Sequence, residues 1–551
     1  MTLNKKRAIF FRFLIFGMVS MIIFSCAVQQ KPQGGPRDVT PPRLLKATPK
    51  NMTHNFSSKT IVLDFDEYFK LVNQYQEITI SPTLEPLPDY NYTKKPKSLI
   101  ITFKDKDTLQ KNTTYVINFG KAIADLNEGN VLKNFTYVFS TGTHIDSLSI
   151  SGNVTNILNQ QKEKDVTVML FTLKQDSLRF GKLKPTIYTT TDTAGNFTLG
   201  NLHEGYYKLY ALKETAPNKI YDNDNELIAF PNKLINLQTD TTGVQLKLFK
   251  PIPSKFRFPD HKFDVDGKLL LVFNRPVEKP TLHIIYPNGL DADKYMEISK
   301  TRDTAQIYLK NMDFDSLRVA LFENNKPLDS VSVRKGRKES FIHGVYIRTN
   351  ADIGGLLKPG VDLSIIASTP ITSYDPSLIT LLEDSTTVNN FILVKDTANL
   401  KHLMLKYPWK QNTAYTLTLN EGALTGFFGD KNKKIPKRFR IDKPQNYGQI
   451  TLTVTVPDTA HNYIVELLND QGMVLRSDVV KKSRSLVYKD YLAGKYHVRV
   501  AYDDNGNGKW DSGSIKEGRQ PENIWVDKAV ILLRANWESK FDIIIPREAT
   551  L

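Results

Sequence analysis

The chain has 551 residues, 40% of them hydrophobic, and a formal net charge of +16 from 74 basic and 58 acidic residues. This length predicts several domains, because one domain usually takes about 100–200 residues. Cys26 is the only cysteine, which excludes an intrachain disulfide and leaves packing to hold the fold together. Lys and Arg are spread along the chain, so the basic excess indicates a solvated surface, with attraction to a membrane or an acidic partner as the alternative.

The N-terminus carries an export signal pattern. Four basic residues precede the apolar run Phe13–Phe24, which Ser25 and Cys26 follow. The run is shorter than the roughly 20 residues of a membrane-spanning helix and fits the hydrophobic region of a secretory signal. A small residue before cysteine at this point resembles the lipobox of bacterial lipoproteins. The resemblance implies removal of residues 1–25 and acyl chains, such as palmitate, on Cys26. The alternatives are an uncleaved anchor or an ordinary signal with an incidental cysteine.

Residues 26–42 are rich in Pro, Gly and Gln, which predicts a flexible tether. Ala27 follows the cysteine, so the aspartate that retains lipoproteins in the inner membrane is absent. The outer membrane is therefore the expected location, and its periplasmic and cell-surface faces both stay open. An exported, anchored chain is not expected to bind nucleic acid.

Residues 43–143 alternate between apolar and polar positions in short runs bounded by turn residues, which is typical of an antiparallel sandwich. The phrases Phe65-Asp66-Glu67 and Lys111-Asn-Thr-Thr-Tyr115 resemble the bacterial Ig-like domain of surface proteins. The resemblance implies a spacer or binding module without catalysis. The expected strands are Thr60–Asp66, Glu77–Ser81, Ser98–Phe103, Thr114–Phe119 and Phe135–Ser140.

Residues 144–249 contain the phrases Asp192–Leu202 and Glu204–Ala211. These are similar to the prealbumin-like domain of the carboxypeptidase-regulatory type, again an all-β sandwich without an active site. Gly205 supplies the turn, and Tyr207 is expected to point inward. Residues 250–339 show only two convincing strands, Leu269–Phe273 and Leu317–Phe322, and indicate a degenerate β domain.

The second half of the chain repeats the first. In residues 340–444, Gln411-Asn-Thr-Ala-Tyr415 matches Lys111–Tyr115 and predicts a second Ig-like domain. In residues 445–551, Leu492–Tyr496 matches Leu202–Tyr206 and predicts a second prealbumin-like sandwich. The two tyrosines of the Ig-like pair are expected to pack as tyrosine corners.

One stretch has the spacing of a calcium loop. Alternate oxygen-bearing residues in a tight loop converge on one point, and Ca²⁺ takes six to eight oxygens. Position 12 of the loop is Ser514 instead of the bidentate Glu, so the alternative is a turn closed by Asx side chains. A structural Ca²⁺ is the only cofactor considered, and its ligands would be Asp503, Asn505, Asn507, the Lys509 carbonyl and Asp511.

No catalytic motif is found in the sequence. There is no HExxH, no Gly-rich phosphate loop after a strand, and the nine histidines are scattered. We therefore expect a protein that is not an enzyme. A recurring Asp-(Ser/Thr) motif resembles the O-glycosylation acceptor of exported Bacteroidetes proteins, and simple turn chemistry explains it equally well.

Together these features resemble an Ig-like-domain outer-membrane lipoprotein of Bacteroidetes. The fold class expected is all-β, with tandem antiparallel sandwiches. The expected function is a structural scaffold that binds an outer-membrane protein partner, such as a β-barrel assembly or secretion complex. The alternative is a carbohydrate- or ligand-binding surface lipoprotein, which would need an aromatic platform from Trp409, Trp510, Trp525 and Trp537.

Overall fold

A computed structural model describes residues 37–92, 97–104, 109–223, 225–253, 255–335 and 341–549. The chain is almost entirely β, as expected, and forms tandem antiparallel sandwiches. It divides into two compact units, residues 1–146 and 147–551. Among the residues described, no helix has the length and apolar character needed to cross a membrane. The predicted signal, Cys26 and most of the tether lie outside these residues.

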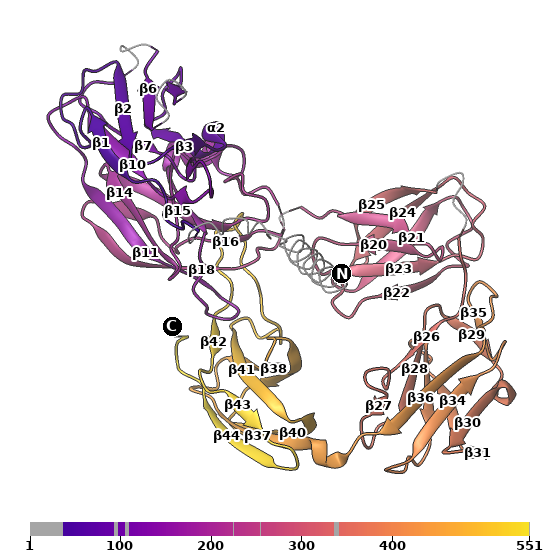
Figure 1. Cartoon of the computed structure of the whole chain (residues 1–551). Coiled ribbons are helices and arrows are strands. Elements are labelled where there is room, and N and C mark those ends of the chain that lie inside the picture. Colours follow the sequence, from indigo (N-terminus) through magenta and orange to yellow (C-terminus); the bar gives the residue numbers. More distant parts are fainter. Residues whose placement is uncertain are drawn as a thin grey trace, which may run out of the picture. The chain divides into compact units, whose positions relative to one another are not determined.

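The first unit consists of a single sandwich, which we call the first sandwich (Figure 1). Its two main sheets have the orders β1-β2-β6-β5 and β10-β7-β4, and β3, β8 and β9 form a small third sheet. A four-residue helix, α2 (Gln74–Glu77), precedes β4. The strands are β1 (Leu44–Thr48), β2 (Thr60–Phe65), β3 (Phe69–Leu71), β4 (Thr79–Ser81), β5 (Asp89–Asn91), β6 (Ser98–Thr102), β7 (Thr114–Asn118), β8 (Ile123–Asp125), β9 (Val131–Leu132) and β10 (Thr136–Ser140).

Tyr115 is packed as the sequence predicts. Its ring is fully buried and stacks on Phe139 with 5.3 Å between ring centroids. Its hydroxyl oxygen accepts the backbone N–H of Gln110 at 2.8 Å. The tyrosine thus satisfies a loop N–H from inside the core, which is a structural role.

The second sandwich has one sheet ordered β14-β11-β18 and another ordered β13-β12-β15-β16, with β17 also pairing with β15. Its first and last strands, β11 and β18, run parallel to each other. The helix α3 (Leu173–Arg179) follows β12. The strands are β11 (Leu148–Asn156), β12 (Thr167–Thr172), β13 (Ile187–Thr190), β14 (Asn196–Leu202), β15 (Gly205–Lys213), β16 (Leu227–Ala229), β17 (Ile235–Leu237) and β18 (Thr241–Leu248).

The third sandwich corrects the expectation of a degenerate domain with two clear strands. It has seven strands around a buried core, in the orders β19-β20-β23-β22 and β21-β24-β25. The same orders appear in the first sandwich once β3, β8 and β9 are set aside. The strands are β19 (Asp260–Phe263), β20 (Leu269–Val272), β21 (Pro280–Tyr286), β22 (Tyr295–Ile298), β23 (Thr304–Tyr308), β24 (Ser316–Glu323) and β25 (Lys326–Arg334).

Where the first sandwich has β8 and β9, the third sandwich has a tight hairpin. Asn324 and Asn325 alone connect β24 to β25, with φ of 50° and 63°. Two consecutive positive φ values are what a type I′ hairpin turn requires, and Asn tolerates them. The chain therefore turns directly where the first sandwich makes its β8–β9 excursion.

The fourth sandwich has sheets ordered β26-β28-β33-β32 and β27-β36-β34-β30-β31, with a separate β29-β35 pair. Tyr415 repeats the bond made by Tyr115, since its hydroxyl accepts the backbone N–H of Lys410 at 2.7 Å. The strands are β26 (Ile347–Thr349), β27 (Leu356–Leu357), β28 (Leu363–Ala367), β29 (Ile371–Tyr374), β30 (Ile379–Glu383), β31 (Thr386–Val388), β32 (Ile392–Lys395), β33 (His402–Lys406), β34 (Ala414–Leu419), β35 (Leu424–Gly426) and β36 (Ile435–Ile441).

The fifth sandwich has the strand orders of the second, β40-β37-β44 and β39-β38-β41-β42, with β43 also pairing with β41. Its first and last strands, β37 and β44, are again parallel. The strands are β37 (Tyr447–Thr455), β38 (Asn462–Asn469), β39 (Val474–Val480), β40 (Arg484–Leu492), β41 (Gly494–Asp503), β42 (Ile524–Val526), β43 (Ile531–Leu533) and β44 (Glu538–Ile544).

The tyrosine alignment of the second and fifth sandwiches needs a shift of one residue. Tyr207 is buried and its hydroxyl donates to the His203 carbonyl at 2.9 Å, while Tyr206 is 57% exposed. Tyr496 is buried and donates to the Leu492 carbonyl at 2.6 Å. Tyr207, and not Tyr206, is thus the counterpart of Tyr496, because one extra residue precedes it in the turn.

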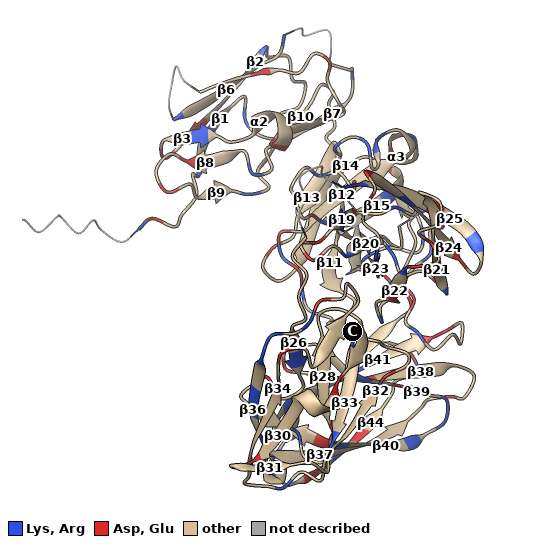
Figure 2. Cartoon of the chain, turned by 90° about the vertical axis from the view of Figure 1, so that its right-hand side faces the viewer, with Lys and Arg blue, Asp and Glu red and all other residues tan. Residues whose placement is uncertain are grey.

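Basic and acidic residues are interspersed along the strands and loops of the sandwiches (Figure 2). Many lie in local pairs, such as Arg275 with Glu323 and Arg499 with Glu466. The distribution agrees with the solvated surface that the spread of Lys and Arg in the sequence indicates.

Candidate interdomain site

Of the five residues predicted to bind calcium, Asp503 ends β41 and the other four lie in the loop that follows. The Asp503 carboxylate is buried and accepts the backbone N–H groups of Asn507 and Gly508, each at 2.9 Å. The side-chain oxygens of Asn505 and Asn507 each accept the N–H two residues ahead, at 3.0 and 2.8 Å. These are Asx turns, the alternative that the sequence left open.

The remaining loop residues are also engaged in protein contacts. The side-chain amides of Asn505 and Asn507 both donate to the Asp511 carboxylate. The Lys509 ammonium lies 3.1 Å from Glu278 of the third sandwich, and this hydrogen bond lowers the pKa of the Glu278 carboxyl. In the described ranges, no three His, Cys, Asp or Glu side chains are grouped to hold a metal. Calcium at this loop stays a prediction.

A buried carboxylate closes the loop from behind. Glu522 accepts the backbone N–H groups of Asp504 at 3.0 Å and Asp511 at 2.8 Å. Burial raises the pKa of Glu522, since the charged form loses its hydration. Trp510 donates its indole N–H to the Glu522 carbonyl at 2.9 Å. The loop is thereby a fixed element and can serve as a contact surface.

That surface rests on the end of the second sandwich. The Ile252 N–H donates to the Gly513 carbonyl at 3.0 Å, and the Ser512 hydroxyl donates to the Lys250 carbonyl. A Cβ added to Gly513 would lie 2.5 Å from the ring of Phe249. Glycine is therefore required at 513 for the loop to approach this closely.

The two sandwiches also share a hydrophobic cluster, which we call the docking interface. In the second sandwich, β12 and β15 bury apolar side chains on both faces, one face toward their own core and the other toward the fifth sandwich. In the fifth, the outward residues of β38, β41 and β42 meet them. The fully buried members are Ile157, Met169, Phe171, Tyr188, Tyr210, Leu212, Ile228, Phe249, Ile464, Ala501 and Ile524.

Polar side chains form hydrogen bonds between the two sandwiches at the edges of the docking interface. The amide of Gln160 donates to the Ile524 carbonyl at 2.8 Å, and that of Gln520 donates to the Phe230 carbonyl at 2.7 Å. Arg499 donates to the Leu158 carbonyl at 3.2 Å while its Nε lies 2.6 Å from Glu466. The interface thus combines an apolar centre with a polar rim, as stable protein interfaces do.

Sequence reasoning did not find the docking interface, although a signal was present. A half-buried strand alternates apolar and polar residues, whereas Val168–Phe171 is apolar at every position. Such a continuous run indicates a strand covered on both faces. Met169 and Phe171 are the residues whose apolar character the core of one sandwich does not explain.

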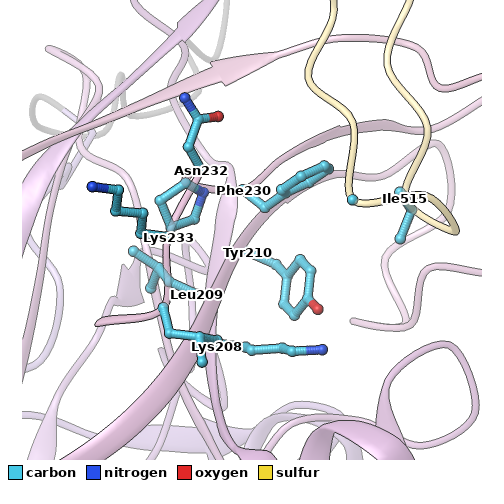
Figure 3. Close-up of a pocket in the computed structure, with 10 residues that line it drawn as sticks. Lys208, Leu209, Tyr210, Phe230, Asn232, Lys233 and Ile515 are labelled. Carbon is cyan, nitrogen blue, oxygen red and sulfur yellow. The ribbon is translucent and has the colours of Figure 1, made fainter. Parts of the chain in front are cut away.

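A pocket opens at the border of the docking interface. It has a volume of about 190 Å³. The rings of Tyr210 and Phe230 face the loop that carries Ile515 (Figure 3). The lining residues are Lys208, Leu209, Tyr210, Phe230, Pro231, Asn232, Lys233, Leu234, Ile515 and Gly518.

The four tryptophans do not share a platform. Trp409 packs against the core of the fourth sandwich, with its ring 4.9 Å from that of Tyr415. Trp510 packs on the docking interface, and Trp525 against the core of the fifth sandwich. Only Trp537 is largely exposed, at 61%. The aromatic platform required by the carbohydrate-binding hypothesis is therefore not formed by these residues.

Several Asp-(Ser/Thr) motifs lie in turns. Asp192, Asp396 and Asp458 each accept the backbone N–H of the residue two positions ahead, at 2.8 to 3.0 Å. This is the turn chemistry that the sequence offered as one explanation. Glycosylation of the neighbouring hydroxyls stays a prediction.

The fold is a tandem array of β-sandwiches, and one of the sandwiches matches a known domain family. Residues 38–141 match the family model of a bacterial Ig-like domain, which covers the first sandwich. A search of curated proteins finds no match to the chain.

Solved structures give weak likenesses. The major pilin subunit BcpA of Bacillus cereus is 10% identical, with 72% of this chain and 99% of that one covered, at a TM-score of 0.13. The S-layer protein SbsC is 9% identical, with 84% and 65% covered, at 0.14. The glucan-utilisation protein SGBP-B of Bacteroides ovatus, solved with a mixed-linkage heptasaccharide, is 13% identical, with 62% and 86% covered, at 0.19. These TM-scores are too low to carry an argument.

Proposed function

We propose that the protein is a non-catalytic, lipid-anchored scaffold of the outer membrane. Acyl chains on Cys26 would hold it there, and residues 26–42 would separate the lipid from the first sandwich. Its role would be to bind an outer-membrane protein, as an accessory subunit of a β-barrel assembly or secretion complex.

The docking interface is the observation that carries the scaffold proposal. Domains of one chain are expected to move relative to one another unless the interface between them is large and hydrophobic. Here the fifth sandwich buries apolar side chains against the second, and the Lys509–Glu278 pair adds a contact to the third. A partner would therefore meet the surfaces of the second and fifth sandwiches in a fixed arrangement, which lowers the entropic cost of binding.

The anchor is tested by exchanging one atom. Cys26→Ser removes the thiol through which the anchoring acyl chains would be attached, so the protein should move from the membrane fraction to the soluble fraction. Incorporation of labelled palmitate by wild type and not by Cys26→Ser is the second readout. A variant that stays in the membrane fraction overturns the anchor.

The scaffold role is tested by purifying the full acylated protein from native membranes and identifying proteins that co-elute in fixed stoichiometry. Wild type is compared with Ile464→Asp, which disrupts the docking interface. We expect a defined partner with wild type and a reduced amount with the variant. Wild-type protein that elutes alone, even after mild cross-linking, would refute the scaffold role.

A further inference from the structure

The pocket beside the docking interface is built from both sandwiches. Tyr210 and Phe230 come from the second sandwich, and Ile515 and Gly518 from the fifth (Figure 3). The ring of Tyr210 is held in place by two contacts. The Phe180 ring stacks on it with 4.1 Å between ring centroids, and the Tyr210 hydroxyl donates to the Asp176 carboxylate at 2.9 Å. An aromatic surface with fixed orientation is thus present before any ligand arrives.

The size of the pocket limits what it can hold. A dry cavity of about 150 Å³ accommodates benzene, whereas pockets for drug-sized ligands take about 300–1,000 Å³. At about 190 Å³, this pocket fits one aromatic ring and little more. Its dimensions therefore fit a single side chain of a bound protein and exclude a drug-sized ligand.

The charge of the residues that line the pocket indicates which residues would flank the bound side chain in the partner. Two lysines line it, and no Asp or Glu does. Lys208 is paired with Asp176 at 2.6 Å, so its charge is compensated. Lys233 is exposed and makes no hydrogen bond or ion pair within the described ranges. The uncompensated charge at the rim is therefore positive and complements an acidic partner segment.

We propose that this pocket anchors one aromatic side chain of an acidic segment in the protein partner. The proposal rests on the proposed scaffold function and names the chemistry by which the partner is recognised. Buried aromatic side chains seated in well-packed pockets are typical interface hot spots, and complementary charge around them selects the partner. Because Ile515 and Gly518 belong to the fifth sandwich, the site is complete only when that sandwich is docked.

The direct test uses fluorescein-labelled peptides and the full mature chain, with fluorescence anisotropy as the readout. The probes are Asp-Asp-Phe-Asp-Asp, its Ala-centred form and Lys-Lys-Phe-Lys-Lys. We expect the acidic Phe peptide to bind at least tenfold more tightly than the Ala form, since losing a buried aromatic anchor costs that much or more. The basic peptide should not bind. Equal binding of the Phe and Ala peptides, or no binding of either, overturns the proposal.

Two variants locate the binding. Lys233→Glu reverses the rim charge and should weaken the acidic Phe peptide severalfold, with less salt dependence than wild type. Asn232→Trp adds bulk to the lining and should compete with the Phe ring. Lys489→Glu, an exposed substitution on β40 in the other sheet of the fifth sandwich, is the matched control for charge and should bind as wild type. Unchanged affinity in both pocket variants would overturn the assignment.

Capture from native membranes separates this proposal from the function on which it rests. If wild type retains a partner and Asn232→Trp loses it, both stand. If Asn232→Trp retains the partner as well as wild type does, the scaffold function stands and the pocket proposal fails. If neither retains a partner, the scaffold function itself fails.

Discussion

Ile464 tests whether the second and fifth sandwiches are joined by the docking interface. It is 3% exposed and lies on β38, on the face directed away from the core of its own sandwich. Ile464→Ala removes three buried carbons and leaves a cavity, which costs about 2–5 kcal/mol in a packed core. Here that cost should fall on docking, because the core of the fifth sandwich does not contain Ile464.

Hydrogen exchange measures the docking free energy directly. The Ile252 N–H donates to the Gly513 carbonyl across the interface, so it exchanges when the sandwiches separate. A loss of 2 kcal/mol corresponds to about thirtyfold faster exchange, which mass spectrometry of a peptide containing residues 250–253 would detect. Amides of β37, inside the fifth sandwich, should keep their wild-type rates.

The control for this experiment is Val487→Ala, at a position that is 49% exposed on β40 in the other sheet. It should change neither set of amides. If Ile464→Ala accelerates exchange throughout the fifth sandwich and leaves residues 250–253 unchanged, Ile464 stabilises its own sandwich and the docking argument is wrong.

Three further predictions concern single contacts. Tyr415→Phe should lower the free energy of unfolding in urea by about 1–3 kcal/mol, because it leaves a backbone N–H without its acceptor. Tyr286→Phe, at an exposed position, should not change it measurably, and equal effects of the two variants would contradict the argument. The Arg275 guanidinium lowers the pKa of Glu323 from its ordinary 4.5, so the pair stabilises fully above pH 4.5 and is lost as the pH falls through the lowered value. Glu323→Gln should therefore destabilise by about 1.5–3 kcal/mol at neutral pH and by little in strong acid, and a pH-independent difference would refute the linkage. If the predicted calcium loop binds Ca²⁺, millimolar Ca²⁺ should raise the wild-type melting temperature and not that of Asp511→Asn, and an unchanged wild-type value would rule it out.

Strands were predictable where one face of a sheet meets solvent. The expected strands Thr60–Asp66 and Ser98–Phe103 correspond to β2 and β6 within one residue at their ends, because alternation marks the buried face. The Lys111–Tyr115 and Gln411–Tyr415 repeat likewise anticipated two tyrosines with the same hydrogen bond.

The sequence predicted two strands of the third sandwich, β20 and β24, and missed the other five, whose signals are weak. Tyr295–Ile298 (β22) is half-buried at every position, so no face stands out in the sequence. Asp260–Phe263 (β19) has exposed residues in its middle. The Asn324-Asn325 pair between two alternating runs was the usable signal, since such a pair marks a two-residue hairpin.

The helix α3 was missed although its start is marked. Thr172 and Gln175 form a capping box, with the Gln175 N–H bonded to the Thr172 hydroxyl and the Gln175 side chain accepting the Thr172 N–H. The pattern Thr-x-x-Gln is a recognised helix start. The docking interface, by contrast, depends on which sandwich meets which, and no local pattern encodes that.

The parallel pairing of the first and last strands in the second and fifth sandwiches has a mechanical consequence. In the second sandwich six residue pairs, from Ile150↔Thr241 to Asn156↔Leu248, lie side by side, and seven do so in the fifth. Tension applied through the two ends of such a sandwich loads all these backbone bonds in shear at once, instead of opening them one after another. A tethered chain pulled between a lipid and a partner would therefore keep these two sandwiches folded at forces that would unzip strands paired at one end.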